Sequence, residues 1–144
     1  MKKLLITLFL AVTFLIQGIS QTTNFTFQEF QIITNTITES VCPVMVDSET
    51  RFDKILALQD ANGTFIAQYN YTLVNTAKSD YSALQIETIL RIKEAELLKE
   101  LKQNDGMKII RDSNIIISYV YYDKYKDVFM IIKLTPEKYN ARSI

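Results

Sequence analysis

The chain has 144 residues, 48% of them hydrophobic, which is the balance of a single globular domain and not of a disordered chain. Lys plus Arg and Asp plus Glu each number 16, so the chain is not basic and gives no electrostatic reason to expect a nucleic-acid partner. Histidine is absent, which excludes Ser-His-Asp and Cys-His catalysis and removes the commonest metal ligand. We expect no cofactor and no metal, and we assign no catalytic residue.

The first twenty residues have the pattern of a Sec-type signal peptide. Two lysines follow Met1, the run from Leu4 to Ile16 is apolar apart from two threonines, and Gly18 and Ser20 are small residues placed for cleavage. The apolar run is shorter than the ~20 residues that a membrane span requires. We therefore expect cleavage near Ser20. The mature chain, residues 21–144, would be a single exported domain, periplasmic or secreted, with no transmembrane segment.

Residues 26–41 are predicted to form the first helix. Apolar residues recur every three or four positions, as in an amphipathic helix that covers a sheet, although this face could also bind a partner. The helix should end at Cys42-Pro43, because the residue before a proline is disfavoured in the α region. Cys42 is the only cysteine, so it cannot form an intramolecular disulfide. We expect a buried, inert thiol, with intermolecular pairing as the alternative.

The stretch from Asp47 to Val74 reads as a β-hairpin with its turn at residues 60–63, where Asn62-Gly63 is a strong hairpin signal. The second strand alternates, with apolar and aromatic residues on one face and polar residues on the other, which predicts one packed and one solvated face. The first strand, about residues 51–59, is less regular, because Lys54 shares a face with Phe52 and Leu56 in a regular strand.

The second helix is predicted from Tyr81 to about Gln103, with Ser79 or Asp80 as its N-cap. Its apolar stripe consists of Ile86, Ile89, Leu90, Leu97 and Leu101. We expect Gly106 to end it in a left-handed C-cap. The charged residues of this helix are expected to form a solvated face.

A second hairpin is predicted, with strands at residues 114–122 and 128–134 and a turn at residues 123–127. Both of its faces are apolar, which favours the sheet centre. The order α-β-β-α-β-β predicts an α+β fold, in which two helices pack on a single antiparallel sheet of about four strands.

Two groups of residues are candidates for ligand binding. The first is a polar cluster before and at the start of the first strand, formed by Asp47, Thr50, Arg51 and Asp53. The second is a set of strand tyrosines that could line a pocket with their hydroxyl groups, namely Tyr69, Tyr71, Tyr119 and Tyr121. Each group also has a structural explanation, since turn residues and Arg51 can satisfy the carboxylates and tyrosines can fill the core as cross-strand pairs.

Three short motifs resemble small exported bacterial proteins of uncharacterised function. They are Cys42-Pro43-x-x-Val46-Asp47-x-x-Thr50-Arg51-x-Asp53, Tyr69-x-Tyr71-Thr72-Leu73 and Tyr119-x-Tyr121-Tyr122-Asp123. The similarity spans roughly residues 41–134, and this chain lacks the second cysteine that such proteins often carry late in the sequence. The order of elements is also similar to that of cystatin-like and NTF2-like α+β folds, which is an analogy of fold and carries no function.

Three functions remain open. The first is a non-enzymatic exported module that binds a protein or a component of the cell envelope. The second is a carrier of a small ligand in a tyrosine-lined pocket. The third is an isomerase or dehydratase of the NTF2-like kind that uses an Asp with a Tyr. The volume of the interior cavity should separate them, because a closed core favours the first, a dry pocket the second, and a pocket with a buried carboxylate the third.

Overall fold

The computed structural model describes residues 25–141, so the predicted signal peptide and its cleavage site lie outside the described residues. The described chain forms one five-stranded sheet with four α-helices and two short 3₁₀ helices. The helices are α2 (Phe27–Val41), η1 (Lys78–Asp80), α3 (Ala83–Gln103), η2 (Asp105–Met107), α4 (Lys108–Asp112) and α5 (Pro136–Asn140). The strands are β1 (Val44–Met45), β2 (Thr50–Gln59), β3 (Phe65–Leu73), β4 (Ile116–Tyr122) and β5 (Val128–Leu134). The α+β class is confirmed.

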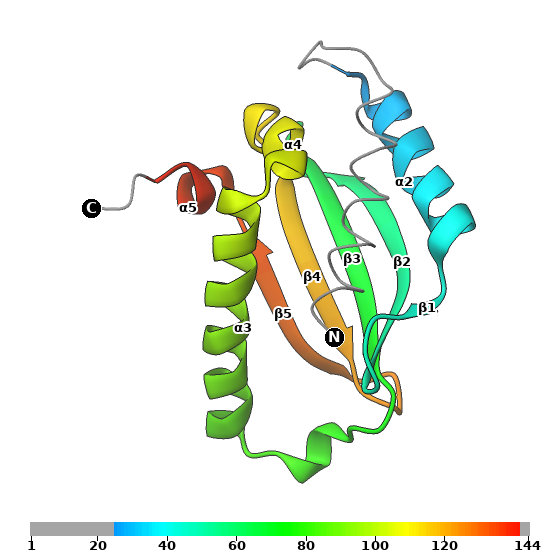
Figure 1. Ribbon diagram of the computed structural model, residues 1–144, viewed down its shortest axis with the longest axis vertical. Coiled ribbons are helices and arrows are strands. Elements are labelled where there is room, and N and C mark those ends of the chain that lie inside the picture. The colour runs from blue at the N-terminus through cyan, green and yellow to red at the C-terminus, as the bar shows by residue number, and fades with distance from the viewer. Residues whose placement is uncertain (1–24, 142–144) are drawn as a thin grey trace.

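The sheet is mixed, which corrects the prediction of an antiparallel sheet of about four strands. Its order is β1-β2-β3-β4-β5, and every neighbouring pair is antiparallel except β3 and β4, which are parallel. The cause is the connection between them, because α3 carries the chain back along the sheet before β4 begins (Figure 1). Consequently β4 is an interior strand, as its two apolar faces predict, whereas β5 is an edge strand.

The first hairpin forms as predicted, with two local differences. Only Gly63 has a positive φ in its turn, while the Asp60 side chain accepts hydrogen bonds from the backbone N–H groups of Asn62 and Thr64, both at 2.9 Å. A bulge at Asp53 changes the register between Phe52 and Lys54. The bulge places Phe52 and Ile55 on the same buried face and leaves Lys54 exposed, which resolves the irregular pattern of this strand.

Helix α2 begins and ends where the sequence predicts. Thr26 is its N-cap and forms a capping box with Glu29, and Cys42 is its C-cap. The helix packs on β2, and the Thr38 hydroxyl both accepts a hydrogen bond from the Ile55 N–H at 3.0 Å and donates one to the Ile55 carbonyl at 3.1 Å. Beyond the residues of β2 that pair with β1, the Thr38 side chain of α2 therefore binds the backbone groups that a neighbouring strand would otherwise bind.

Helix α3 is also found where predicted, but its caps differ. Ser82 is the N-cap, in a capping box with Gln85, because Ser79 and Asp80 belong to η1. Gly106 lies in η2 and does not have a positive φ. The C-terminal carbonyls are instead bound by Arg111, whose Nη1 donates to the carbonyls of Leu101 at 2.5 Å and Asn104 at 2.8 Å.

The second hairpin is held at its turn by a buried carboxylate. Asp123 is 1% exposed and accepts hydrogen bonds from the backbone N–H groups of Lys78, Tyr125 and Asp127 at 2.8–3.0 Å. The N–H group of Lys78, and after it those of Asp127 and Tyr125, hold the pKa of Asp123 below its usual value. Asp123 thus joins the β4–β5 turn to η1, far away in the sequence.

Candidate functional site

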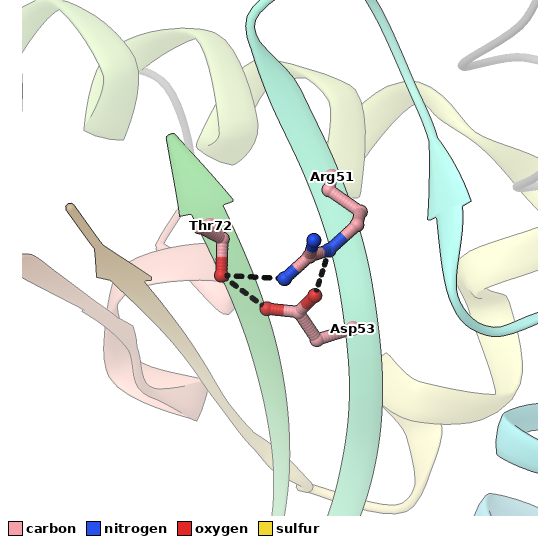
Figure 2. A network of polar contacts seen from close by, with 3 residues as sticks. All are labelled: Arg51, Asp53 and Thr72. Carbon is pink, nitrogen blue, oxygen red and sulfur yellow. Dashed lines mark hydrogen bonds and ion pairs between the residues drawn. The ribbon is translucent and has the colours of Figure 1, made fainter. Parts of the chain in front are cut away.

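The predicted ligand-binding residues lie on two faces of the sheet and do not form one site. The four tyrosines face the helices, in the buried core. The side chains of Arg51, Asp53 and Thr72 lie together on the opposite face (Figure 2). Asp47 lies in the turn before β2, and Thr50 is the first residue of β2.

The polar network on the second face of the sheet is internally satisfied. One Asp53 carboxylate oxygen accepts a hydrogen bond from Arg51 Nε at 2.5 Å, and the other accepts one from the Thr72 hydroxyl at 2.5 Å (Figure 2). Arg51 Nη2 also lies 3.5 Å from the Thr72 hydroxyl oxygen. The pairing of Asp53 with Arg51 agrees with the structural explanation of the polar cluster. Thr72, buried beneath the pair, completes a network that ties the bulge of β2 to β3.

Asp47 has a structural partner as well. Its Oδ1 accepts hydrogen bonds from the backbone N–H groups of Glu49 at 2.8 Å and Thr50 at 2.7 Å. This is the turn-forming behaviour of an aspartate before a strand. Ligand binding by Asp47, Thr50, Arg51 or Asp53 stays a prediction. In this geometry the carboxylates of Asp47 and Asp53 already accept hydrogen bonds from other groups of the chain.

The tyrosines form a layer of rings across β3 and β4, continued by Phe52 on β2. Ring centroids lie 5.4 Å apart for Tyr69 and Tyr119 and 5.0 Å apart for Tyr71 and Tyr121. All four side chains are less than a tenth exposed, and burial raises the pKa of each hydroxyl above its usual value. No hydrogen bond joins these hydroxyls to another described residue, whereas the Tyr139 hydroxyl donates to the Ile115 carbonyl at 2.9 Å.

Cys42 is half-buried and has no disulfide partner. Burial, helped by the negative charge of Asp53, raises the pKa of its thiol to about 11, which makes it a poor nucleophile at neutral pH. Among residues 25–141, no three Cys, Asp or Glu side chains gather as metal ligands would. No helix within the same range is long and apolar enough to cross a membrane.

A groove that the sequence did not single out lies between the first half of α3, η1 and the start of β5. Its volume is about 660 Å³, and its lining is mostly apolar, with Lys78, Glu87 and Asp127 as the charged members. The apolar lining consists of Tyr81, Ala83, Ile86, Leu90 and Phe129. The Tyr81 ring meets the Phe129 ring edge to face, with centroids 5.4 Å apart.

The groove escaped prediction because its residues share no sequence motif. Ile86 and Leu90 belong to the regular stripe of α3, and that stripe gives no sign that its first half would lie against open space. Phe129 is the residue skipped by the register shift between Tyr121 and Tyr122 on β4, and such bulges redirect a side chain. The groove could have been predicted only from the placement of a long helix beside an edge strand. That placement is known only once the order of the strands in the sheet is known.

Comparisons with known proteins agree with the fold. The crystal structure of a putative secreted protein from Pseudomonas aeruginosa superposes with a TM-score of 0.56 over 83% of this chain and 97% of that one, at 9% sequence identity. No protein of curated function matches the sequence. Residues 28–130 match the family described as a domain of unknown function, DUF8479, and this match covers more than half of the chain. The chain therefore belongs to the DUF8479 family.

Proposed function

We propose that the protein is an exported, non-enzymatic module that binds another protein through the groove between α3 and β5. Export is supported by the signal-peptide pattern of residues 1–20 and by the fold shared with a putative secreted protein. Binding is supported by one observation above all. The groove exposes a mostly apolar lining on the surface, as protein-interaction sites do, and this lining consists of described residues.

The interior of the protein favours a surface function. The cavity between α2, the sheet and α4 has a volume of about 30 Å³ and is lined almost wholly by apolar side chains. Small-molecule sites occupy about 300–1,000 Å³, so a cavity of this size cannot hold a metabolite. Of the three functions that the sequence leaves open, the small volume of this cavity fits the binding module best.

A small ligand over the tyrosine layer is a second candidate, favoured by one specific observation. The hydroxyls of Tyr69, Tyr71, Tyr119 and Tyr121 have no hydrogen-bond partner among the described residues, although their rings are buried. No wholly buried polar side-chain atom of the described chain lacks a partner, so these hydroxyls lie at the boundary of the core. A ligand that supplied hydrogen bonds there would satisfy several of them at once.

Site-specific photo-crosslinking in the producing cell tests the proposal. A photoreactive residue at Leu90 lies in the groove, whereas one at Ile92 lies on the same helix, 58% exposed and outside the groove lining. We expect a discrete protein adduct from position 90 that position 92 does not give. Identical adducts from both positions, or no adduct from position 90, would contradict binding through the groove.

A further inference from the structure

The stripe of α3 that faces the sheet is buried unevenly along the helix. In the second half, Leu97 and Leu101 are 6% and 1% exposed, but in the first half Ile86 and Leu90 are only half-buried. The helix packs on β5, which is the last strand of the sheet. The first half of α3 therefore presents apolar side chains to a space that no described strand fills.

Among the described residues, the backbone edge of β5 has no partner strand beside this space, and one carbonyl further along is bound by a side chain. At Lys133 the carbonyl accepts a hydrogen bond from Lys138 Nζ at 3.1 Å, and Lys138 in turn pairs with Glu94 of α3 at 2.5 Å. No described strand pairs with β5 on its outer side. The unpaired stretch, residues 128–132, contains Phe129, which also lines the groove.

An extended chain is the one kind of occupant that can both pair with an unpaired strand edge and fill an apolar groove beside it. Backbone N–H and C=O groups in a row pair with an extended chain, and the alternate side chains of such a chain enter a neighbouring pocket. A helix or a compact surface would fill the groove but leave the strand edge unpaired.

A second copy of this chain does not fit the groove. If β5 of another copy paired with β5 of the first, the face directed at the groove would carry Ile132 and Leu134, which are 1% and 0% exposed in their own copy. These side chains are already packed under their own α3 and cannot enter a second groove. The occupant must bring apolar side chains that are free before binding.

We propose that an extended, apolar segment of a partner protein pairs with residues 128–132 of β5 as a sixth strand and places alternate side chains in the groove under α3. This inference rests on the proposed function and specifies the chemistry of the partner. The segment lacks proline at its paired positions, because proline has no N–H to donate, and carries aliphatic or aromatic residues at every second position.

Selection from a phage-displayed library of random peptides, followed by NMR with a selected peptide, tests this mode. We expect selected sequences with alternating apolar residues, and slower hydrogen exchange of alternate β5 amides when the peptide is bound. Leu90→Asp should weaken binding at least tenfold, while Ile92→Asp, the exposed control on the same helix, should leave it unchanged. Proline at the centre of the peptide should abolish binding.

The result separates the binding mode from the proposed function. A peptide that binds the groove as a helix, or leaves the exchange of β5 amides unchanged, overturns strand addition even where crosslinking from Leu90 shows a partner. Failure to select any peptide that contacts β5 also overturns it. Loss of the position-90 adduct, in contrast, overturns the proposed function itself.

Discussion

The two edges of the sheet differ in how many of their backbone N–H and C=O groups are bound by other described residues. At the β2 edge, β1 pairs with residues 51 and 52, and beyond β1 the Thr38 hydroxyl takes both backbone groups of Ile55. At the β5 edge, the carbonyl of Lys133 accepts a hydrogen bond from Lys138, and no described strand pairs with β5 on its outer side. Among the described residues, β1 and Thr38 therefore cover residues 51, 52 and 55 of the β2 edge, whereas only one carbonyl of the β5 edge is covered.

Unprotected strand edges promote unwanted pairing, and soluble proteins usually block them. Here the chain blocks one edge with a strand and a side chain, so it has the means to do so. The β5 edge adjoins the first half of α3, where Ile86, Ile89 and Leu90 of the inner stripe are only half-buried. The coincidence of these two features at β5 is the reason to regard this edge as a place for binding and the β2 edge as part of the fold.

The largest expected effect contrasts the two halves of α3. Leu101→Ala should lower the free energy of unfolding by about 2–5 kcal/mol, because Leu101 is 1% exposed and its loss leaves a cavity. Leu90→Ala should lower it by about 1 kcal/mol, since Leu90 lies in the open groove. Urea unfolding of both variants measures the difference. Equal losses would mean that α3 is packed evenly and that the groove is closed in solution.

A smaller effect is expected at the closed edge. Thr38→Val preserves the shape of the side chain but leaves the N–H and C=O groups of Ile55 without their partner, at a cost of about 1–3 kcal/mol. Thr36→Val is the matched control, because its exposed hydroxyl bonds only to the Ile32 carbonyl within the helix, and it should cost less than about 0.5 kcal/mol. A Thr38 variant as stable as its control would remove the evidence that this edge is closed by α2.

The smallest effect depends on pH and concerns the turn that precedes β5. The folded-state pKa of Asp123 is lowered, so its stabilisation is present above the unfolded pKa of about 3.9 and is lost as the pH falls through the folded value. Wild type should therefore be more stable than Asp123→Asn at neutral pH, and the difference should shrink in acid. Asp127→Asn, in the same turn but exposed, is the matched control and should lower the stability at neutral pH by less than Asp123→Asn does. A difference that does not change with pH would contradict the role of the carboxylate.

Local signals in the sequence predicted most of the elements. The helix that starts near Thr26, the Asp60–Gly63 turn and the stop at Pro43 each depend on a few adjacent residues, and each was found within a residue or two. The parallel pairing of β3 with β4 could not be predicted in this way, because it depends on where α3 returns the chain. The N-cap at Ser82 was missed because three serine or aspartate residues compete within four positions.

The candidate site also combines features that adjacent residues predict with features that depend on how the strands pair. The pairing of Asp53 with Arg51 follows from their closeness in sequence, whereas the contribution of Thr72 comes from the neighbouring strand. The bulge at Asp53, which places this pair opposite the tyrosines, depends on pairing with β3. The groove required the sheet order, since only an edge strand leaves the inner face of α3 without a strand beneath it.

Hydrogen exchange of the free protein, measured residue by residue by NMR, tests the difference between the two edges most directly. We predict that the amide of Ile55 exchanges slowly, because the Thr38 hydroxyl accepts its hydrogen bond. We also predict that within residues 128–132 the amides not bonded to β4 exchange rapidly. Slow exchange of every β5 amide in the free protein would show that this edge is already covered, and would contradict the account.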